Sequence, residues 1–498
     1  MNRLTLPAAW RRHLPTDVLT WLYAAFVGLL LVCGSIALLT KDSGWWLVPF
    51  VAPAVVALFY DWRWAYYLLL FSLAFSHEIN LPNGLSTDIP SEPLMLVVTG
   101  CCLAGLITGA IRLPRRLLGH PLVLLVFLAW LWAATSTLVS VDTLKSVKYL
   151  LAKTWYLIPF GMVTWLVVRR PAHVWRVAGC YTAGVALSTL YSVLRHAGSG
   201  FRFDTIHQAV QPFYRNHVIY AATLALLIPY TWYAARAAHT RWGRRLWLGA
   251  FWLFLFGVFT SYTRASILAV VLSGVFYYII RWRLTRLLLI GSALATLLAV
   301  VYFVQQNKYL LYAPDYEKTV FYGDNFEKHL EATYKLEDVS GMERLYRWVA
   351  AARMFHDKPI TGTGPSTFYP EYKHYTVKSF RTYVSDNPER STTHNYFLLL
   401  LAEQGLPGLL LFAFLLSTAL LLIERLYHQS KDPVLRNVVL AAGLSFYIIV
   451  FHLLLNELVE VDKIGSFFFI ALVILIRVQE WVYQPETRLT ADDSSSPG

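Results

Sequence analysis

Residues 395–423 read NYFLLLLAEQGLPGLLLFAFLLSTALLLI, an apolar run in which Glu403 is the one charged side chain. About 20 apolar residues suffice for a helix to cross the hydrocarbon core of a bilayer, and this run is longer. The whole chain follows the same trend, with 57% hydrophobic residues, 15% charged residues and a mean hydropathy of +0.48. A soluble core of ordinary composition cannot take up so much apolar surface, so the sequence predicts an integral membrane protein.

Apolar runs that span, or nearly span, a bilayer recur along the rest of the chain. They lie near residues 17–39, 44–60, 63–77, 93–111, 120–139, 150–168, 174–196, 216–236, 246–262, 265–281, 284–304, 434–455 and 463–482. Together with the quoted run they predict an all-α polytopic fold of about 14 transmembrane helices. A count of 12 is the alternative, because several of the runs are short. No internal repeat is evident, which argues against the inverted repeats of many transporters.

The arginines predict how the chain is oriented, because short cytoplasmic loops collect Lys and Arg. With the N-terminus inside, alternate loops are basic; these loops carry Arg63; Arg112, Arg115 and Arg116; Arg169 and Arg170; Arg236, Arg241, Arg244 and Arg245; Arg281, Arg283 and Arg286; and Arg425 and Lys431. The intervening loops, such as 77–92 and 456–462, are polar or acidic. Both termini are therefore expected in the cytoplasm. The net charge of +13 is scattered over helix ends and does not indicate nucleic-acid binding.

This pattern divides the chain into four regions. We expect N-terminal transmembrane helices at 1–304, an outward-facing segment at 305–393, C-terminal transmembrane helices at 394–484 and a disordered cytoplasmic tail at 485–498. The outward segment contains an amphipathic pattern near 341–357, with an apolar face formed by Met342, Leu345, Val349, Ala352 and Phe355. Its many aromatic residues suit contact with sugars or lipid headgroups, or equally the packing of a small subdomain onto the membrane.

Cysteine usage and ligand spacing bear on metals and cofactors. Cys33, Cys101, Cys102 and Cys180 all lie in predicted transmembrane helices, where a thiol acts as a small apolar residue. We therefore expect no disulfide and no metal site from them. The sequence has no cluster of Asp, Glu, Cys or His at metal-ligand spacing, so chemistry without a metal or other cofactor is expected.

The quoted run begins just after Thr393-His394, which makes His394 the first candidate for chemistry. We expect Thr392 or Thr393 to cap the helix and His394 to lie in its first turn. The positive end of the helix dipole there disfavours imidazolium and leaves the neutral imidazole that a general base needs. A capping or headgroup-level histidine with no catalytic part is the alternative.

Several arginines share the outward side with His394. Arg264 lies in the turn TSYTRAS (260–266), where the positive-inside rule disfavours it and a position at the edge of the hydrocarbon is costly unless paired. Its guanidinium suits a phosphate. Arg215, Arg344 and Arg347 are on the same side; each alone is also compatible with snorkelling or a salt bridge. A general base together with several arginines predicts the transfer of a group from a lipid phosphate donor to a hydroxyl that the base activates.

Three motifs in order along residues 260–412 resemble the superfamily of O-antigen ligases and O-antigen polymerases, which are bacterial membrane glycosyltransferases. The motifs are Thr260-x-x-x-Arg264-Ala265-Ser266; Arg344-x-x-x-Trp348 with Pro359-x-x-Gly362-x-Gly364-x-x-x-Phe368; and His394-Asn395 with Gly405-x-x-Gly408. The third motif is most similar to ligases and related protein O-oligosaccharyltransferases, whereas polymerases share the first two. The N-terminal half matches only as a string of membrane helices.

The resemblance implies a bundle of the GT-C kind in the bacterial inner membrane. It implies metal-independent, inverting transfer of a polysaccharide from undecaprenyl diphosphate to a lipid A-core acceptor sugar on the periplasmic face. By resemblance, His394 is the base and Arg264 and Arg344 hold the diphosphate, with Arg347 and Arg215 added from the residues alone. Asn395, Trp348, Gly362, Gly364, Gly405 and Gly408 would support the site. The alternatives are a polymerase or protein O-oligosaccharyltransferase with the same donor, or a transporter of a lipid-linked glycan.

Overall fold

A computed structural model describes residues 61–80, 86–305, 339–377 and 392–483, with isolated residues at 28, 32, 35, 308 and 385. By its internal contacts the chain divides into two units, residues 1–66 and 67–498, and most described residues belong to the second. The predicted helices at 17–39 and 44–60 lie almost wholly outside the described residues, and so does the predicted disordered tail.

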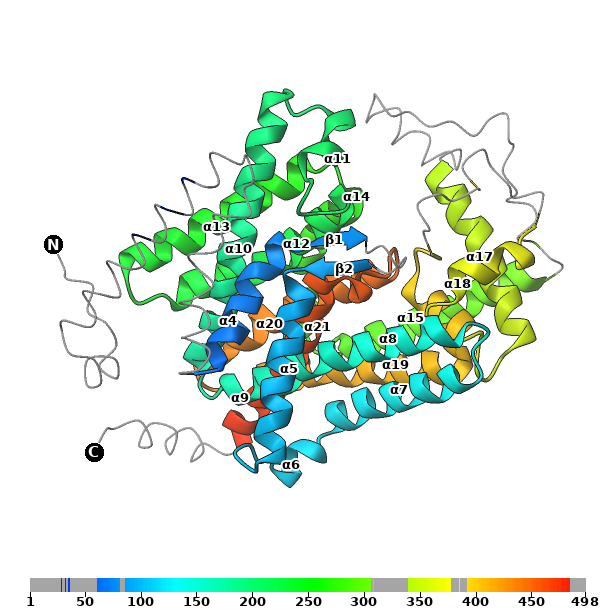
Figure 1. Cartoon of the computed structure of the whole chain (residues 1–498), viewed down its shortest axis with the longest axis horizontal. Coiled ribbons are helices and arrows are strands. Elements are labelled where there is room, and N and C mark those ends of the chain that lie inside the picture. The colour runs from blue at the N-terminus through cyan, green and yellow to red at the C-terminus, as the bar shows by residue number, and fades with distance from the viewer. Residues whose placement is uncertain are drawn as a thin grey trace. The chain divides into compact units, whose positions relative to one another are not determined.

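Helices account for nearly all of the described chain (Figure 1). The long ones are α4 (Arg63–Ser72), α5 (Ser91–Ile107), α7 (Pro121–Leu138), α8 (Thr143–Leu157), α10 (Pro171–Gly198), α12 (His217–Ala237), α13 (Arg241–Thr260), α14 (Arg264–Arg281), α15 (Thr285–Val304), α17 (Val339–Asp357), α19 (Tyr396–Gln429), α20 (Pro433–Leu453) and α21 (Asp462–Tyr483). The short ones are η2 (Leu73–Phe75), α6 (Arg115–Leu118), η3 (Ile158–Val163), α9 (Thr164–Val167), η4 (Phe203–Thr205), α11 (Ile206–Ala209), α18 (Phe368–Glu371), η6 (Tyr372–Tyr375) and η8 (Leu458–Glu460).

The predicted all-α polytopic membrane fold is confirmed. Within the described residues, nine helical runs are long and apolar enough to cross a membrane: α7, the continuous run α8–η3–α9, α10, α12, α14, α15, α19, α20 and α21. Three further predicted segments coincide with the shorter apolar helices α4–η2 and α5 and with α13. Each apolar run predicted beyond residue 62 therefore corresponds to a helix.

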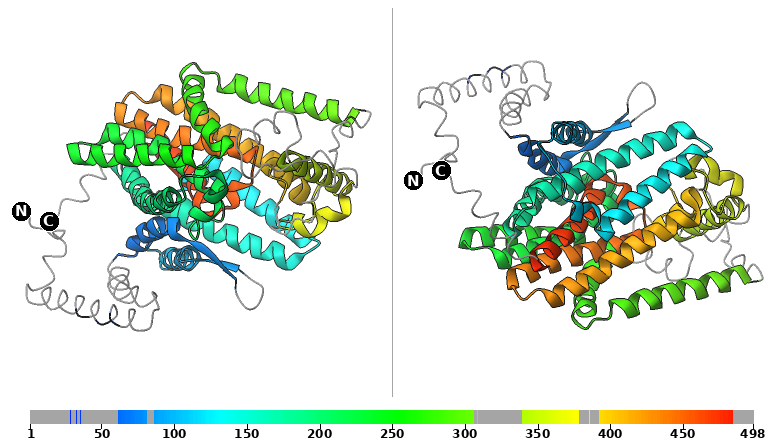
Figure 2. Two further views of the ribbon diagram at one scale, coloured as in Figure 1. Left: turned by 90° about the horizontal axis from the view of Figure 1, so that it is seen from above. Right: turned by 90° about the horizontal axis from the view of Figure 1, so that it is seen from below.

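The centre of the bundle is formed by α12, α20 and α21. In these helices 89%, 72% and 83% of the most apolar stretch is buried, whereas none of the corresponding stretch of α15 is buried. Helices that are apolar all round are those that a bundle can enclose. Figure 2 shows α15 along one edge, where its apolar surface faces the lipid expected around a membrane protein.

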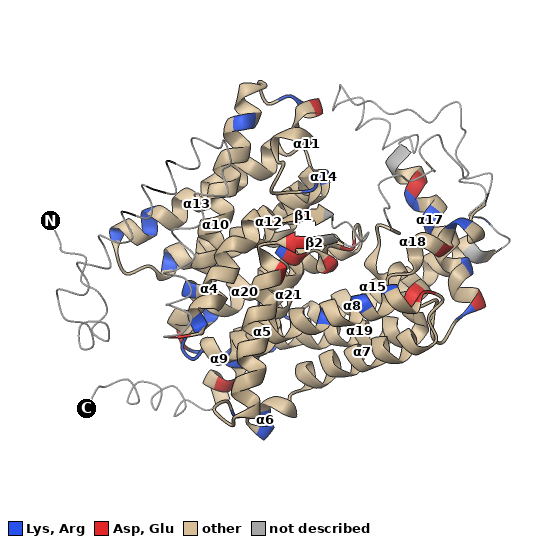
Figure 3. Ribbon diagram, in the orientation of Figure 1, with Lys and Arg blue, Asp and Glu red and all other residues tan. Residues whose placement is uncertain are grey.

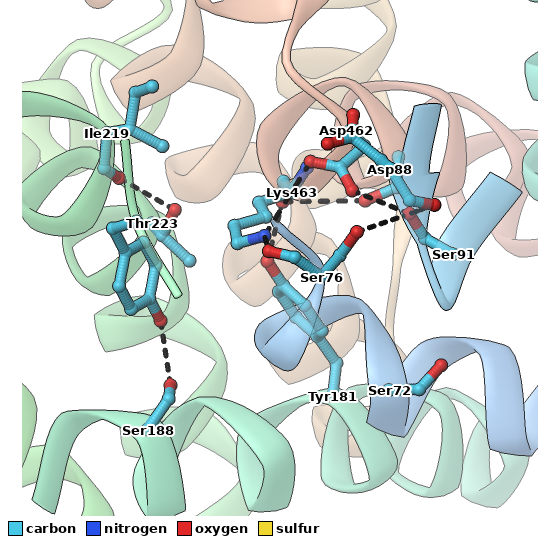
Figure 4. A network of polar contacts seen from close by, with 12 residues as sticks. Ser72, Ser76, Asp88, Ser91, Tyr181, Ser188, Ile219, Thr223, Asp462 and Lys463 are labelled. Carbon is cyan, nitrogen blue, oxygen red and sulfur yellow. Dashed lines mark hydrogen bonds and ion pairs between the residues drawn. The ribbon is translucent and has the colours of Figure 1, made fainter. Parts of the chain in front are cut away.

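A two-stranded antiparallel hairpin occupies the polar loop at 77–92, where no strands were predicted. Its strands are β1 (His77–Asn80) and β2 (Ser86–Ile89), with His77 opposite Ile89. Close to the hairpin, the buried pair Asp462 and Lys463 begins α21 (Figure 4). The Ser91 hydroxyl donates to the Asp462 carboxylate at 3.0 Å, and Lys463 Nζ donates to the Ser76 carbonyl at 2.7 Å. These bonds fix the start of α21 to the residues that flank the hairpin.

The helices α13 and α14 meet at the turn before Arg264, and each has basic residues at its far end. α13 runs from Arg241 to Thr260, and α14 returns from Arg264 to Arg281. In Figure 3 the first turns of α13 are among the basic segments gathered at one side of the view. Arg264 is thus separated by the length of a helix from the arginines at the start of α13 and at the end of α14.

Candidate functional site

His394 lies just before α19 and not within its first turn. α19 begins at Tyr396, and the side-chain oxygen of Asn395 caps it by accepting from the Leu398 N–H at 3.1 Å. His394 has a φ of 51°, in the left-handed region that few residues other than glycine adopt. The prediction that Thr392 or Thr393 caps the helix is wrong, because the Asn395 amide takes that role.

The imidazole of His394 is held by the loop between α20 and α21 (residues 454–461, the α20–α21 loop). His394 Nδ1 and Asn456 Oδ1 are 3.3 Å apart, and the Asn395 amide donates to the Leu454 carbonyl at 3.1 Å. When Nδ1–H donates to Asn456, the lone pair of a neutral ring is left on Nε2. The α20–α21 loop therefore fixes both the position of His394 and the nitrogen that can accept a proton.

The pKa of His394 lies below its usual value. Burial is the largest cause, and the positive charges of Arg347 and Arg344 lower the pKa further, while Glu457 and the bond to Asn456 raise it. Burial disfavours a charged imidazolium because the ring loses its contact with water. The sequence predicted a neutral imidazole because of the helix dipole. In the structure, burial and the nearby arginines favour that neutral form.

Helix α17 packs against the segment before His394, and its buried face differs from the predicted one. Met342 is buried as expected, but Leu345, Val349, Ala352 and Phe355 lie at half-buried or exposed positions. The face that is buried carries Met342, Glu343, Tyr346, Arg347, Ala350, Ala351 and Met354. The sequence pattern missed this face because it contains an ion pair, Arg347 with Glu343 at 3.3 Å, in which both side chains are less than 8% exposed.

Two adjacent residues of α17 clamp the backbone that leads into His394. Arg347 Nη1 donates to the Thr392 carbonyl at 3.3 Å, and Trp348 Nε1 donates to the Thr393 carbonyl at 2.9 Å. These contacts give Arg347 and Trp348 a positioning role. Arg344, one turn earlier, is half-buried and acts on His394 through its charge.

Arg264 lies next to residues that contact the end of α20, where the loop that holds His394 begins. It is the first residue of α14, and two residues later the Ser266 hydroxyl is bonded to His452 Nε2 at 3.0 Å. His452 is in the last turn of α20, and its carbonyl accepts from the Asn456 N–H at 2.8 Å. A short chain of bonds therefore links the start of α14 to the loop that holds His394.

Arg215 lies farther out, before α12. The Thr263 hydroxyl donates to the His217 carbonyl at 3.3 Å, so the first turns of α12 and α14 are adjacent. Two long helices thus direct the positive ends of their dipoles to neighbouring positions, an arrangement that favours an anion. Arg215 itself is exposed and lies 3.9 Å from Glu78 of the hairpin. The structure brings His394, Arg344 and Arg347 together, sets Arg264 nearby at the end of α20, and leaves Arg215 at the rim.

The two glycine motifs, Gly362/Gly364 and Gly405/Gly408, meet at a break in α19, which we call the joint. α19 is interrupted at Gly405, whose φ and ψ are 66° and −168°. At the interruption, the Thr363 and Gly364 N–H groups donate to the Ala402 and Glu403 carbonyls at 3.0 and 2.8 Å, and the Leu406 N–H donates to the Pro359 carbonyl at 2.9 Å. The loop at 359–368 (the joint loop) thereby supplies hydrogen bonds that the broken helix would otherwise lack.

Glu403 completes the joint from within α19. Its buried carboxylate accepts from the Ser366 and Phe368 N–H groups, each at 2.9 Å. A Cβ on Gly362 would collide with the Glu403 backbone, which explains why this motif position is glycine. Gly408 lies one turn beyond the break beside Trp132, whose Nε1 donates to the Gln404 carbonyl at 2.8 Å.

Replacement of Gly405 with alanine is expected to destabilise the protein. A Cβ there would collide with the Ile360 carbonyl, and the backbone conformation is one that residues with a side chain adopt at a cost of about 1–3 kcal/mol. We expect a lower melting temperature in detergent, measured by fluorescence-detected size exclusion after heating. Gly274→Ala in α14 is the matched control, because nothing lies within 4 Å of its added Cβ. Equal melting temperatures for both variants would contradict the role given to the joint.

The sequence missed the contribution of the α20–α21 loop. Glu460 Oε1 accepts from Tyr396, Tyr149 and Lys153 at 2.7, 3.2 and 2.9 Å, and Asn456 holds His394. In the sequence, this loop stands out only as one of the polar loops expected on the outward side. No local pattern relates Asn456 to a histidine 62 positions away, so only the fold could have revealed the pair.

The side chains that meet at the site carry imidazole, guanidinium and amide groups. Within the described ranges no group of three or more His, Cys, Asp and Glu side chains is placed to hold a metal ion. Cys101, Cys102 and Cys180 are free thiols in α5 and α10, and Cys33 lies outside the described residues. The arrangement can accept a proton at His394 Nε2 and can bind an anion through the arginines.

Comparison with known proteins gives a family for the part of the chain that contains the site. Residues 249–413 match the family model described as O-antigen ligase, and this range includes Arg264, Arg344, His394 and the joint at Gly405. A comparison with curated proteins found no match. The predicted resemblance to O-antigen ligases and polymerases is confirmed over the matched residues. The chain is therefore a multi-pass membrane protein that matches, at residues 249–413, the family model described as O-antigen ligase.

Proposed function

We propose that the protein is an O-antigen ligase, which transfers a polysaccharide from undecaprenyl diphosphate to an acceptor sugar of lipid A-core. The observation that carries the proposal is the environment of His394: a half-buried imidazole inside the family match, held through Nδ1 by Asn456, whose pKa is lowered by burial and by Arg347 and Arg344. A base beside cationic groups is what attack of a hydroxyl on a diphosphate-linked sugar requires.

The proposed reaction is a single displacement. His394 Nε2 takes the proton of the acceptor hydroxyl while that oxygen forms a bond to the anomeric carbon from the face opposite the diphosphate. The bond between the anomeric carbon and the diphosphate oxygen breaks, its electron pair stays on the diphosphate, and the configuration inverts. Arg264 and Arg344 stabilise the charge on the leaving diphosphate, and Arg215 helps to gather the donor at the rim. The imidazolium then returns its proton to water.

We assign the site to the periplasmic face of the inner membrane, with both termini in the cytoplasm. The basic ends of α13 and α14 support this orientation, since they lie opposite Arg264. Residues 1–304 and 394–484 then form the membrane region, and residues 305–393 the periplasmic segment with α17. The surrounding membrane lipids are the third partner, beside the donor and the acceptor.

Reconstitution tests the proposal most directly. Purified protein in detergent, supplied with an undecaprenyl-diphosphate-linked glycan and lipid A-core, is expected to produce glycosylated lipid A-core, detected as a mobility shift on a gel. Detergent removes compartments, so a transporter of lipid-linked glycans would give no product. The absence of product, with donor and acceptor both shown to be intact, would overturn the ligase proposal.

Treatment with EDTA is expected to leave the reconstituted activity unchanged. The proposed base and the arginines supply the proton acceptor and the positive charge that a metal would otherwise provide. The measurement is the initial rate before and after dialysis against EDTA, with a metal-dependent glycosyltransferase as a positive control for chelation. Loss of activity that added Mg²⁺ restores would show that the mechanism is wrong.

Deletion of the gene separates a ligase from a polymerase, because Arg264 and Arg344 belong to motifs that both share. Full-length polymer stranded on the lipid carrier indicates a ligase, whereas lipid A-core capped with a single repeat unit indicates a polymerase. Glycoprotein loss with normal lipopolysaccharide indicates a protein O-oligosaccharyltransferase.

A further inference from the structure

The α20–α21 loop is anchored at both ends and along its length. Its first residue accepts the Asn395 amide, Glu460 binds Lys153 of α8 and Tyr396 of α19, and the buried Asp462–Lys463 pair follows directly (Figure 4). A loop held by several polar bonds to three other elements is fixed well enough to position a side chain against His394. The loop is therefore a built part of the site and not a simple connection.

Asn456 is the residue of this loop that touches His394. The residue is 9% exposed, and its backbone N–H donates to the His452 carbonyl at 2.8 Å. An asparagine held in this way can accept from Nδ1–H of a neutral imidazole but cannot itself become charged. It therefore selects one tautomer and directs Nε2 away from the loop, which is the arrangement that a base acting on a bound hydroxyl needs.

Glu457, next to Asn456, places a carboxylate near the same ring. One of its oxygens, Oε2, is buried and has no hydrogen-bond partner, and its negative charge opposes the effect of the α17 arginines on His394. A buried carboxylate oxygen without a partner is costly in a protein. The cost is offset whenever a positive charge forms beside it, as happens when His394 takes a proton.

The charges that act on His394 come from two elements: Arg344 and Arg347 of α17, and Glu457 of the α20–α21 loop. Two further carboxylates on the same elements have partners of their own, since Glu343 pairs with Arg347 and Glu460 with Lys153 of α8. Glu343 and Glu460 are engaged with their own cations, so their charges are largely compensated. The carboxylate of Glu457 remains as the group that can balance a protonated ring.

We propose that Asn456 and Glu457 are positioning residues for His394: Asn456 fixes the tautomer, and Glu457 stabilises the imidazolium formed during transfer. This inference rests on the proposed function of His394 as the base. Neither residue touches the reacting atoms, and both act through the imidazole ring. They add a two-residue element to the site that no motif in the sequence marks.

The pH dependence of transfer tests the inference, because the base must be neutral and the acid limb of the rate profile reports its pKa. Asn456→Asp places a carboxylate on Nδ1, so the acid limb is expected to move to higher pH by about one unit or more. Glu457→Gln removes the charge that raises the pKa of His394, so the limb is expected to move to lower pH. Asn456→Ala is expected to lower the plateau about 10-fold, as part of what a positioned base contributes.

Controls separate these shifts from other titrations. Burial, with Asp462 nearby, raises the pKa of Asp88 to about 7, so all profiles are measured in an Asp88→Asn background as well. Asp357→Asn is the matched charge control, since Asp357 is exposed at the end of α17. Opposite shifts for Asn456→Asp and Glu457→Gln, with none for Asp357→Asn, support the inference.

The experiment distinguishes a failure of the positioning roles of Asn456 and Glu457 from a failure of the proposed function of His394. If His394→Ala is inactive but neither Asn456→Asp nor Glu457→Gln moves the limb, the positioning roles are refuted and the base stands. If His394→Ala remains active, the proposed function itself is refuted. Elution as a single peak in size exclusion shows for each variant that the fold is retained; if Asn456→Ala does not fold, the two charge variants still decide.

Discussion

Replacement of His394 with alanine is expected to reduce glycan transfer by about 10²–10⁴-fold, the contribution of a positioned general base. The ring has a lowered pKa, which favours its neutral form, and its Nδ1 is bonded to the side-chain amide of Asn456. Its loss removes the proton acceptor but no helix packing, because His394 lies outside α19. The rate of product formation from saturating donor and acceptor is the measurement.

His356→Ala is the matched control for this substitution. His356 is on α17 with its side chain 89% exposed, so its removal is expected to leave the transfer rate unchanged. Both variants should elute as the wild type does and should accumulate equally in membranes. If His394→Ala transfers glycan at a rate close to that of His356→Ala, then His394 is not the base.

Replacement of Arg264 or Arg344 with alanine is expected to lower kcat/KM about 10²–10³-fold, the usual effect of removing one group that stabilises charge in a transition state. The two arginines come from different helices, Arg264 from α14 and Arg344 from α17. Inhibition by free undecaprenyl diphosphate should weaken in both variants. Arg353→Ala, at an exposed position of α17, is the control.

Arg347 is expected to respond differently from its neighbour Arg344. Its removal leaves Glu343 buried without a cation, which costs about 3–5 kcal/mol when such a pair is broken. We therefore expect Arg347→Ala to lose thermal stability, measured in detergent, whereas Arg344→Ala keeps its melting temperature and loses activity. A stable, inactive Arg347→Ala would instead restore the diphosphate role that the sequence suggested.

The fold could be predicted well from the sequence because its main determinant is local. An apolar run of sufficient length forms a helix in a membrane whatever its neighbours are, so predicted runs such as 434–455 coincide with helices such as α20. The β1–β2 hairpin and the buried face of α17 could not be predicted. Both depend on tertiary contacts: the hairpin on its docking near Asp462, and the α17 face on the ion pair of Glu343 with Arg347.

The candidate site could be predicted in part, for a related reason. His394 and Arg264 stand out because a polar residue at the end of an apolar run is conspicuous in sequence. The roles of Arg347 and Trp348 could not be seen, because they depend on which carbonyls these side chains reach. Asn456 was likewise hidden in a short acidic loop. The glycines were noticed as motifs, but only the structure gives the reason, which is that 359–368 fills the break in α19.

The break at Gly405 also separates the turns next to His394 from the rest of α19. At 1.5 Å per residue, the part of α19 after the break extends about 36 Å, more than a hydrocarbon core of about 30 Å. Residues 406–429 alone are long enough to cross that core, which leaves the turns before Gly405 to act as a spacer. Such a spacer would fit a donor whose lipid remains in the bilayer while its sugar, carried on two phosphates, reaches the headgroup layer. Because the joint loop fixes the spacer separately, changes in bilayer thickness should tilt the membrane part of α19 without moving His394.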